Sequence, residues 1–150
     1  MQLKYNEKNK FMSRPKQCRK IVSPPLMLGF KPFGIVRLTN DSVILRYDEY
    51  ESVRLLDYEG LRQEDAAEKM NVSRPTLTRI YGNARKTIAK AFVEGKMIMI
   101  DGGNVDFGRI WYRCRKCSKL INGIGNHTPC RNCKSYGNEE LIPINSHDGE

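Results

Sequence analysis

The segment that follows Ser73 carries polar side chains that can contact the edges of DNA bases: Arg74, Thr76, Thr78, Arg79 and Asn83. In the major groove, arginine is the side chain best matched to guanine, and threonine can hydrogen-bond a base or touch a thymine methyl group. Apolar residues recur among them every three or four positions, from Leu77 through Ile80 to Ile88, and form one core-facing stripe of a helix. We therefore expect Arg74 and Arg79 to contact bases, with Thr78 next. The alternative is that these side chains form only a solvated helix face.

Four cysteines near the C-terminus have the CxxC–x12–CxxC spacing of a metal site: Cys114, Cys117, Cys130 and Cys133. Two residues between cysteines allow a tight turn to aim both sulfur atoms at one ion, and two such turns complete a tetrahedral site. We expect one structural Zn2+ ion, because four thiolates form a closed site without redox function. Iron in a rubredoxin-like site is the alternative. Two disulfides are disfavoured, because the chain shows no secretory signal and a reducing compartment is expected.

Two further residues with metal or redox chemistry are assigned minor roles. His127 could replace one cysteine, but with four cysteines already suitably spaced we expect it to be a surface residue. Cys18, the fifth cysteine, lies in a basic N-terminal segment and is expected to be a free thiol. A redox-sensing or metal-sensing role for Cys18 is the alternative.

Two short helical patterns joined by a tight turn must position the base-reading side chains. Ala66 and Ala67 supply small residues where a second helix can cross the first, and Asn71 tolerates left-handed backbone at the turn. Ser73 can cap the second helix, because its hydroxyl accepts a bond from an otherwise unpaired N–H group. Together these features predict a helix-turn-helix whose second helix enters the major groove. An ordinary helical hairpin is the alternative.

A third helix is predicted over residues 48 to 59, after a short extended stretch at 43–47. Asp48 and Glu51 have the spacing of a capping box, and Gly60 suits the position after the helix end. This helix is acidic, so we expect it to form a supporting layer or to contact a partner protein. At the start of the next helix, Arg62 and Gln63 are placed to contact phosphates.

Positive charge is concentrated at the N-terminus. The whole chain has a formal net charge of +9, and most of this excess lies before residue 48. The first twenty residues contain few aliphatic side chains, so residues 1–25 are expected to form a basic, flexible arm. We expect its cations to follow DNA phosphates or to enter the minor groove: Arg14, Lys16, Arg19 and Lys20. A merely solubilising tail is the alternative.

Several of these motifs together resemble a known family. They are SRPKQCRK (13–20), FKPFGI (30–35), DxEGLxQEDAAEKMxVSRPTLxRI (57–80) and ARKTIAKAFVEGK (84–96). The sequence is similar to a prokaryotic family of small proteins predicted to bind DNA through a helix-turn-helix like region four of sigma factors. The resemblance covers about residues 12 to 103 and implies a DNA-binding role. Arg62 and Asn71 depart from the Ser/Thr and Gly that such sequences tend to carry there.

The expected architecture is mainly α: a three-helix helix-turn-helix domain over 26–100, the basic arm, and a small β zinc ribbon over 107–145. No apolar run approaches the ~20 residues of a membrane span, so a cytoplasmic protein without a membrane partner is expected. The expected partner is double-stranded DNA, with RNA polymerase and a second copy of the chain as further candidates. A protein-interaction adaptor that docks on transcription machinery is the alternative function, and RNA binding is a variant of the first. Enzymatic activity is not expected, because no Ser/His/Asp arrangement or phosphate loop is present.

Overall fold

Residues 17–34, 41–126 and 138–144 are described by the structure, a computed structural model. Its central sheet has the strand order β2-β4-β3, in which β4 pairs parallel with β3 and antiparallel with β2. The strands are β2 (Gly29–Phe30), β3 (Ser42–Leu45) and β4 (Met97–Ile100). Successive side chains of a strand point to opposite faces. In β4, Ile98 and Ile100 accordingly pack in the core, whereas Met99 is exposed.

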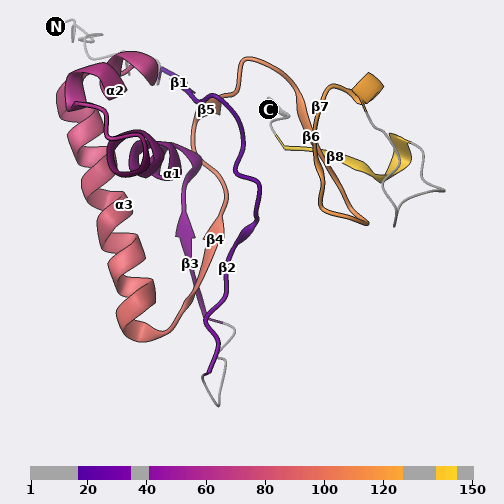
Figure 1. Ribbon diagram of the computed structural model, residues 1–150, viewed down its shortest axis with the longest axis horizontal. Coiled ribbons are helices and arrows are strands. Elements are labelled where there is room, and N and C mark those ends of the chain that lie inside the picture. Colours follow the sequence, from indigo (N-terminus) through magenta and orange to yellow (C-terminus); the bar gives the residue numbers. More distant parts are fainter. Residues whose placement is uncertain (1–16, 35–40, 127–137, 145–150) are drawn as a thin grey trace, which may run out of the picture.

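Three α-helices connect β3 to β4 and form the crossover between these two parallel strands (Figure 1). They are α1 (Tyr47–Val53), continued by a π-helical segment η1 (Arg54–Tyr58), α2 (Gln63–Lys69) and α3 (Arg74–Glu94). One core cluster joins α3 to the sheet: Leu45, Ala84, Ala91, Ile98 and Ile100. A second cluster joins η1, α2 and α3: Leu55, Ala66, Ala67, Met70 and Leu77. The helical layer is therefore held together by its own core and fixed to the sheet by another.

The mainly α fold expected from the sequence is wrong, because the described residues form an α/β structure with strands in three small sheets. The extended stretch expected at 43–47 is present in part, as β3 ends at Leu45. Its partner β4 is separated from it by the whole helical segment. Local periodicity does not reveal a pairing over such a distance, and a four-residue apolar run can be mistaken for the end of a helix.

The first helix begins earlier than expected. Arg46 occupies the N-cap position in place of Asp48, and the Arg46 N–H donates to the Glu49 carboxylate at 2.9 Å. The capping box is therefore formed by Arg46 and Glu49, two residues before the expected pair of Asp48 and Glu51. Gly60 has a φ of 68° after the end of η1, in agreement with its expected role as a helix terminator.

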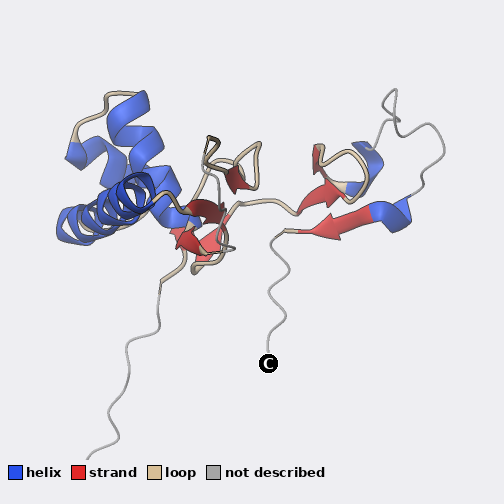
Figure 2. Cartoon of the chain, turned by 90° about the horizontal axis from the view of Figure 1, so that it is seen from below, coloured by secondary structure: helices blue, strands red, loops and turns tan. Residues whose placement is uncertain are grey.

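Two smaller sheets complete the described structure. In one, β1 (Arg19–Lys20) pairs parallel with β5 (Val105–Asp106). In the other, the antiparallel order β7-β6-β8 is formed by β6 (Trp111–Cys114), β7 (Leu120–Asn122) and β8 (Leu141–Pro143). Short 3-10 turns lie at Ile124–Asn126 and Asn138–Glu140. This sheet lies away from the helical layer (Figure 2). The described residues of this region thus form a small antiparallel sheet.

An apolar cluster and the side chain of Arg113 connect the C-terminal sheet to the rest of the chain. Ile21, Val105 and Phe107 are buried together, and Trp111 packs against them. The Arg113 guanidinium donates to the backbone oxygens of Pro25 and Leu26 at 2.9 and 3.0 Å. Within the described ranges, no helix is long and apolar enough to cross a bilayer.

Candidate nucleic-acid interface

The turn between α2 and α3 has the conformation that its residue types favour. Asn71 adopts left-handed backbone with a φ of 54°, as expected from its tolerance of that region. The Val72 N–H donates to the Ala67 oxygen at 3.0 Å, which closes the end of α2. Ala66 and Ala67 are buried beneath α3, where a larger side chain would force the two helices apart. The turn therefore fixes the direction in which α3 leaves α2.

The start of α3 is capped as the sequence predicts. Ser73 is the N-cap, and its hydroxyl accepts a hydrogen bond from the Thr76 N–H at 3.4 Å. The two hydroxyls of Ser73 and Thr76 lie 2.8 Å apart. Thr76 is half-buried and engaged in this cap, so its side chain stabilises the helix start rather than projecting outward. Among the threonines, this leaves Thr78 as the exposed candidate for base contact.

Arg74 and Thr78 share a polar cluster with the first turn of α2. The Arg74 Nε lies 3.2 Å from the Glu64 carboxylate and 3.4 Å from the Gln63 side-chain oxygen. Thr78 Oγ1 donates to the same Gln63 oxygen at 3.2 Å and lies 3.1 Å from the Arg74 carbonyl. If a nucleic acid binds Arg74, the exposed contact between Arg74 and Glu64 is replaced by a contact of Arg74 with a phosphate or a base.

Arg79 is exposed on the same helix and has no hydrogen-bond or ion-pair partner among the described residues. Its guanidinium can therefore bind a ligand without breaking an internal contact. Asn83, one turn further on, is also exposed. By contrast, Arg62 lies 3.2 Å from Asp65 in an exposed pair, which solvent screens and which costs little to exchange.

Further cations continue along the exposed side of α3, where sequence reasoning did not place a contact. Arg85, Lys86 and Lys90 are exposed, and Arg85 lies over the Tyr81 ring at 5.6 Å from its centroid. The Tyr81 hydroxyl donates to Asp57 at 2.7 Å, and this hydrogen bond raises the pKa of Tyr81. The missed signal was the helical spacing of these cations relative to Arg74 and Arg79.

The described part of the basic arm is incorporated into the fold. The Lys20 N–H donates to the Met70 oxygen at 3.0 Å, and Ile21 is buried. Arg19 pairs with Asp48 at 3.2 Å, and the two side chains are 23% and 5% exposed. Arg19 is thus committed to an internal ion pair, whereas the Lys20 side chain is exposed. The predicted phosphate contacts Arg14 and Lys16 lie outside the described residues.

The acidic first helix does not present the acidic surface that its sequence indicates. Asp48, Glu49 and Glu51 are all buried, and each carboxylate has an internal partner. Asp48 pairs with Arg19, and Glu49 accepts the Arg46 N–H. The sequence pattern could not show this, because the cation that neutralises Asp48 comes from a distant strand.

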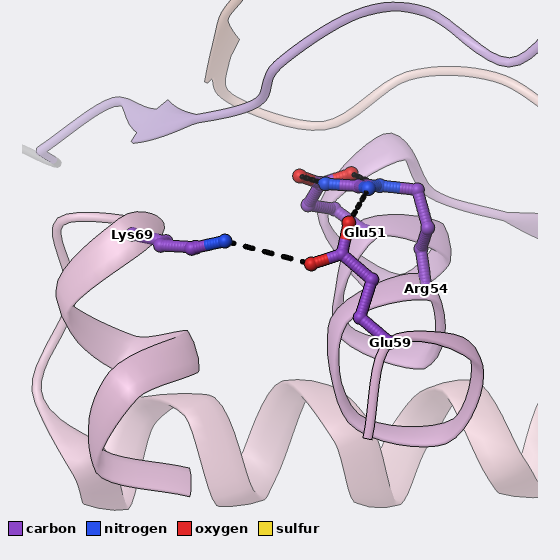
Figure 3. A network of polar contacts seen from close by, with 4 residues as sticks. All are labelled: Glu51, Arg54, Glu59 and Lys69. Atoms are coloured by element: carbon purple, nitrogen blue, oxygen red, sulfur yellow. Dashed lines mark hydrogen bonds and ion pairs between the residues drawn. The ribbon is translucent and has the colours of Figure 1, made fainter. Parts of the chain in front are cut away.

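A second set of acidic groups is neutralised where η1 meets α2 (Figure 3). Arg54 contacts Glu51 through two hydrogen bonds, of 2.7 and 2.8 Å, and also contacts Glu59. The bonds to Glu51 raise the pKa of Arg54. Lys69 at the end of α2 lies 3.5 Å from Glu59. Burial alone would raise the pKa of Glu59, but Arg54 and Lys69 outweigh it and lower that pKa. This network ties α2 to the preceding helix and helps to orient the interface.

The structure includes two of the four expected metal ligands. Cys114 is buried at the end of β6, and Cys117 is half-buried in the turn that follows. The Ser118 N–H donates to the Cys114 oxygen at 2.9 Å, and Ser118 has a φ of 59°. Cys130, Cys133 and His127 lie outside the described residues. Inside the described ranges, no three His, Cys, Asp or Glu side chains group together as a metal site.

Cys18 lies near the pairing of β1 with β5. Its thiol is half-buried and donates to the Asn104 side-chain oxygen at 3.0 Å. Among the cysteines that the structure describes, Cys18 forms no disulfide. The contact to Asn104 gives the residue a packing role where the arm meets the segment before β5.

These observations define a class of α/β protein in which a capped, basic helix is exposed on one side of a small sheet. Residues 9–107 match the family described as "Protein of unknown function DUF134", and the chain belongs to that family.

Relatives named "UPF0251 protein" come from several bacteria. One from Caldicellulosiruptor saccharolyticus is 43% identical over 124 residues, which is 83% of this chain and 86% of the relative. One from Chloroherpeton thalassium is 39% identical over 130 residues, or 87% of this chain and 85% of the relative. One from Thermoanaerobacter pseudethanolicus is 50% identical over 93 residues, covering 62% and 79%. No solved structure matches the chain.

Proposed function

We propose that this protein binds duplex DNA in a sequence-specific manner and regulates transcription, through a helix-turn-helix similar to region four of sigma factors. The observation that supports this proposal most strongly is the exposed N-terminal face of α3. There Arg74, Thr78 and Arg79 project from a helix whose opposite side is buried. In helix-turn-helix proteins this end of the second helix meets the base edges.

Charge and internal pairing favour nucleic acid as the ligand. The chain carries a formal charge of +9, and Asp48, Glu49 and Glu51 are buried within the fold. The exposed side of α3 itself carries cations such as Arg79 and Lys86. The same burial removes most of the acidic surface required by an adaptor that docks through α1. RNA polymerase and a second copy of the chain remain candidate partners of the DNA-bound protein.

Binding-site selection from random duplexes, followed by a salt titration, tests the proposal. We expect one enriched motif, and a logarithmic salt dependence with a slope of about −5 if about six phosphates are engaged. Arg79→Ala should weaken binding by about 1–3 kcal/mol and relax one base position. The control Lys20→Ala should weaken all sequences alike. Equal binding of every sequence, or no dependence on salt, would contradict sequence-specific recognition.

We also propose that Cys114, Cys117, Cys130 and Cys133 bind one structural Zn2+ ion. A closed four-thiolate site of this kind supplies folding free energy on the order of 10 kcal/mol. Elemental analysis should find one zinc per chain. Chelation of the metal should speed up hydrogen exchange at the backbone amides of β6 and β7. Cys117→Ser should lower the zinc content, whereas Cys18→Ser should not. Iron in the purified protein, or no bound metal, would overturn the assignment to zinc.

A further inference from the structure

The cations on the exposed side of α3 form two rows. An α-helix advances by about 100° per residue, so Arg74 and Arg85 lie on one side of the exposed face. Arg79, Lys86 and Lys90 lie on the other side, about 120° away around the helix axis. All five are exposed. Arg74 has the Glu64 partner described above, but Arg79 and Lys86 have no ion-pair partner in the described ranges. Arg85 of the first row likewise forms no ion pair within these ranges, so both rows contain cations that can contact an external anion.

Between the two rows, the surface of α3 carries small side chains. A shallow groove is lined by Gly82, Arg85, Lys86 and Ala89, so small residues form its floor and cations its two walls. A Cβ atom added to Gly82 would meet nothing within 4 Å, and its φ is not in the left-handed region. Glycine within a helix costs about 1 kcal/mol relative to alanine. Neither packing nor backbone conformation requires glycine here, and a glycine allows another molecule to approach the helix backbone closely.

We propose that α3 lies lengthwise in the major groove of duplex DNA, with Arg85 on the phosphates of one strand, Lys86 and Lys90 on those of the other, and Gly82 nearest the bases. Arg74 and Arg79, at the start of the two rows, remain turned to the bases. This inference rests on the proposed function and extends it from the first turn of α3 to Lys90. The span from Arg74 to Lys90 is about 24 Å at 1.5 Å per residue.

The dimensions of B-form DNA agree with this arrangement. A helix with its side chains is about 10–12 Å across, close to the ~12 Å width of the major groove. Both walls of that groove carry phosphates, which explains why cations are useful on both sides of α3. A single strand would use one row, and the major groove of A-form RNA is too narrow and deep for a helix to be read in this way. Figure 1 shows α3 at the outer edge of the molecule, on the side away from the C-terminal sheet.

Phosphate-ethylation interference on a selected duplex tests the arrangement, with three variants of the full chain. Arg85→Ala should remove interference on one strand, and Lys86→Ala with Lys90→Ala should remove it on the other. Each lost phosphate contact should reduce the salt slope by about 1. Gly82→Leu should lower affinity at least tenfold, without lowering the melting temperature, because leucine is a better helix former than glycine. Arg115→Ala removes the same single charge as Arg85→Ala, but from the turn after β6, and should change none of these.

The outcomes separate this inference from the proposed function. If no duplex is selected, both fail. If a motif is selected and Arg79→Ala relaxes it, but the Gly82, Arg85 and Lys86/Lys90 variants behave like Arg115→Ala, only the lengthwise arrangement is overturned. Loss of interference on the same strand by both row variants overturns it as well. Tighter binding of single-stranded DNA or of A-form RNA duplex than of the selected DNA would also reject it.

Discussion

Arg54→Ala is expected to lower the free energy of unfolding by about 3 kcal/mol, because it leaves a buried carboxylate without its counterion. The Glu51 side chain is 1% exposed, and Arg54 holds both of its oxygens. Removal of the guanidinium also takes one of two cations from Glu59, which keeps its contact with Lys69 of α2. Urea denaturation at neutral pH measures the change.

Two control variants separate burial of charge from loss of an ordinary ion pair. Arg62→Ala breaks a pair whose arginine is 82% exposed, and it should cost less than about 1 kcal/mol. Replacement of both Glu51 and Arg54 by leucine removes the unpaired charge and should recover part of the lost stability. A cost for Arg54→Ala no larger than that for Arg62→Ala would show that the network does not stabilise the helical layer.

Leu77→Ala is expected to destabilise the protein by about 3 kcal/mol through lost burial and a residual cavity. Leu77 is fully buried between α2 and α3, where it packs with Leu55, Ala66 and Met70. Because this cluster sets the angle between the two helices, DNA affinity should fall as well. Thermal unfolding and binding to the selected duplex measure the two effects.

Val93→Ala provides the matched control on the same helix. Val93 is 87% exposed, so its truncation should change stability by less than about 0.5 kcal/mol. Equal losses from Leu77→Ala and Val93→Ala would mean that the α2–α3 core does not set the stability of this region.

Local chemistry predicted the turn between α2 and α3 and the start of α3 well. Asn71 at positive φ, Ser73 as N-cap and the buried alanines of α2 are single-residue or short-range signals. The N-cap of α1 was misplaced because Asp48, a good capping residue, is instead paired with Arg19 of β1. A contact between segments so far apart in the chain leaves no local pattern.

The sheets could not be predicted in the same way. β4 pairs with β3 and β2 only because the three helices bring it back beside them. The pairing of β1 with β5 likewise requires the chain to return to its N-terminal part after β4. Arg19 accordingly looked like part of a free arm although it is largely buried. Within the candidate site, Gly82 and Lys86 lie beyond the first turns of α3, where base contacts are expected, so the sequence pattern of those turns does not reveal them.

Nuclear magnetic resonance of the full chain, titrated with the selected duplex, tests the central claim most directly. We expect the largest amide shifts along the exposed side of α3, at Thr78, Arg79, Gly82 and Lys86, with smaller shifts at Gln63 of α2. The amides of β6 and β7 should change little. Shifts confined to the C-terminal sheet, or absent from α3 at saturating duplex, would contradict DNA recognition by this helix.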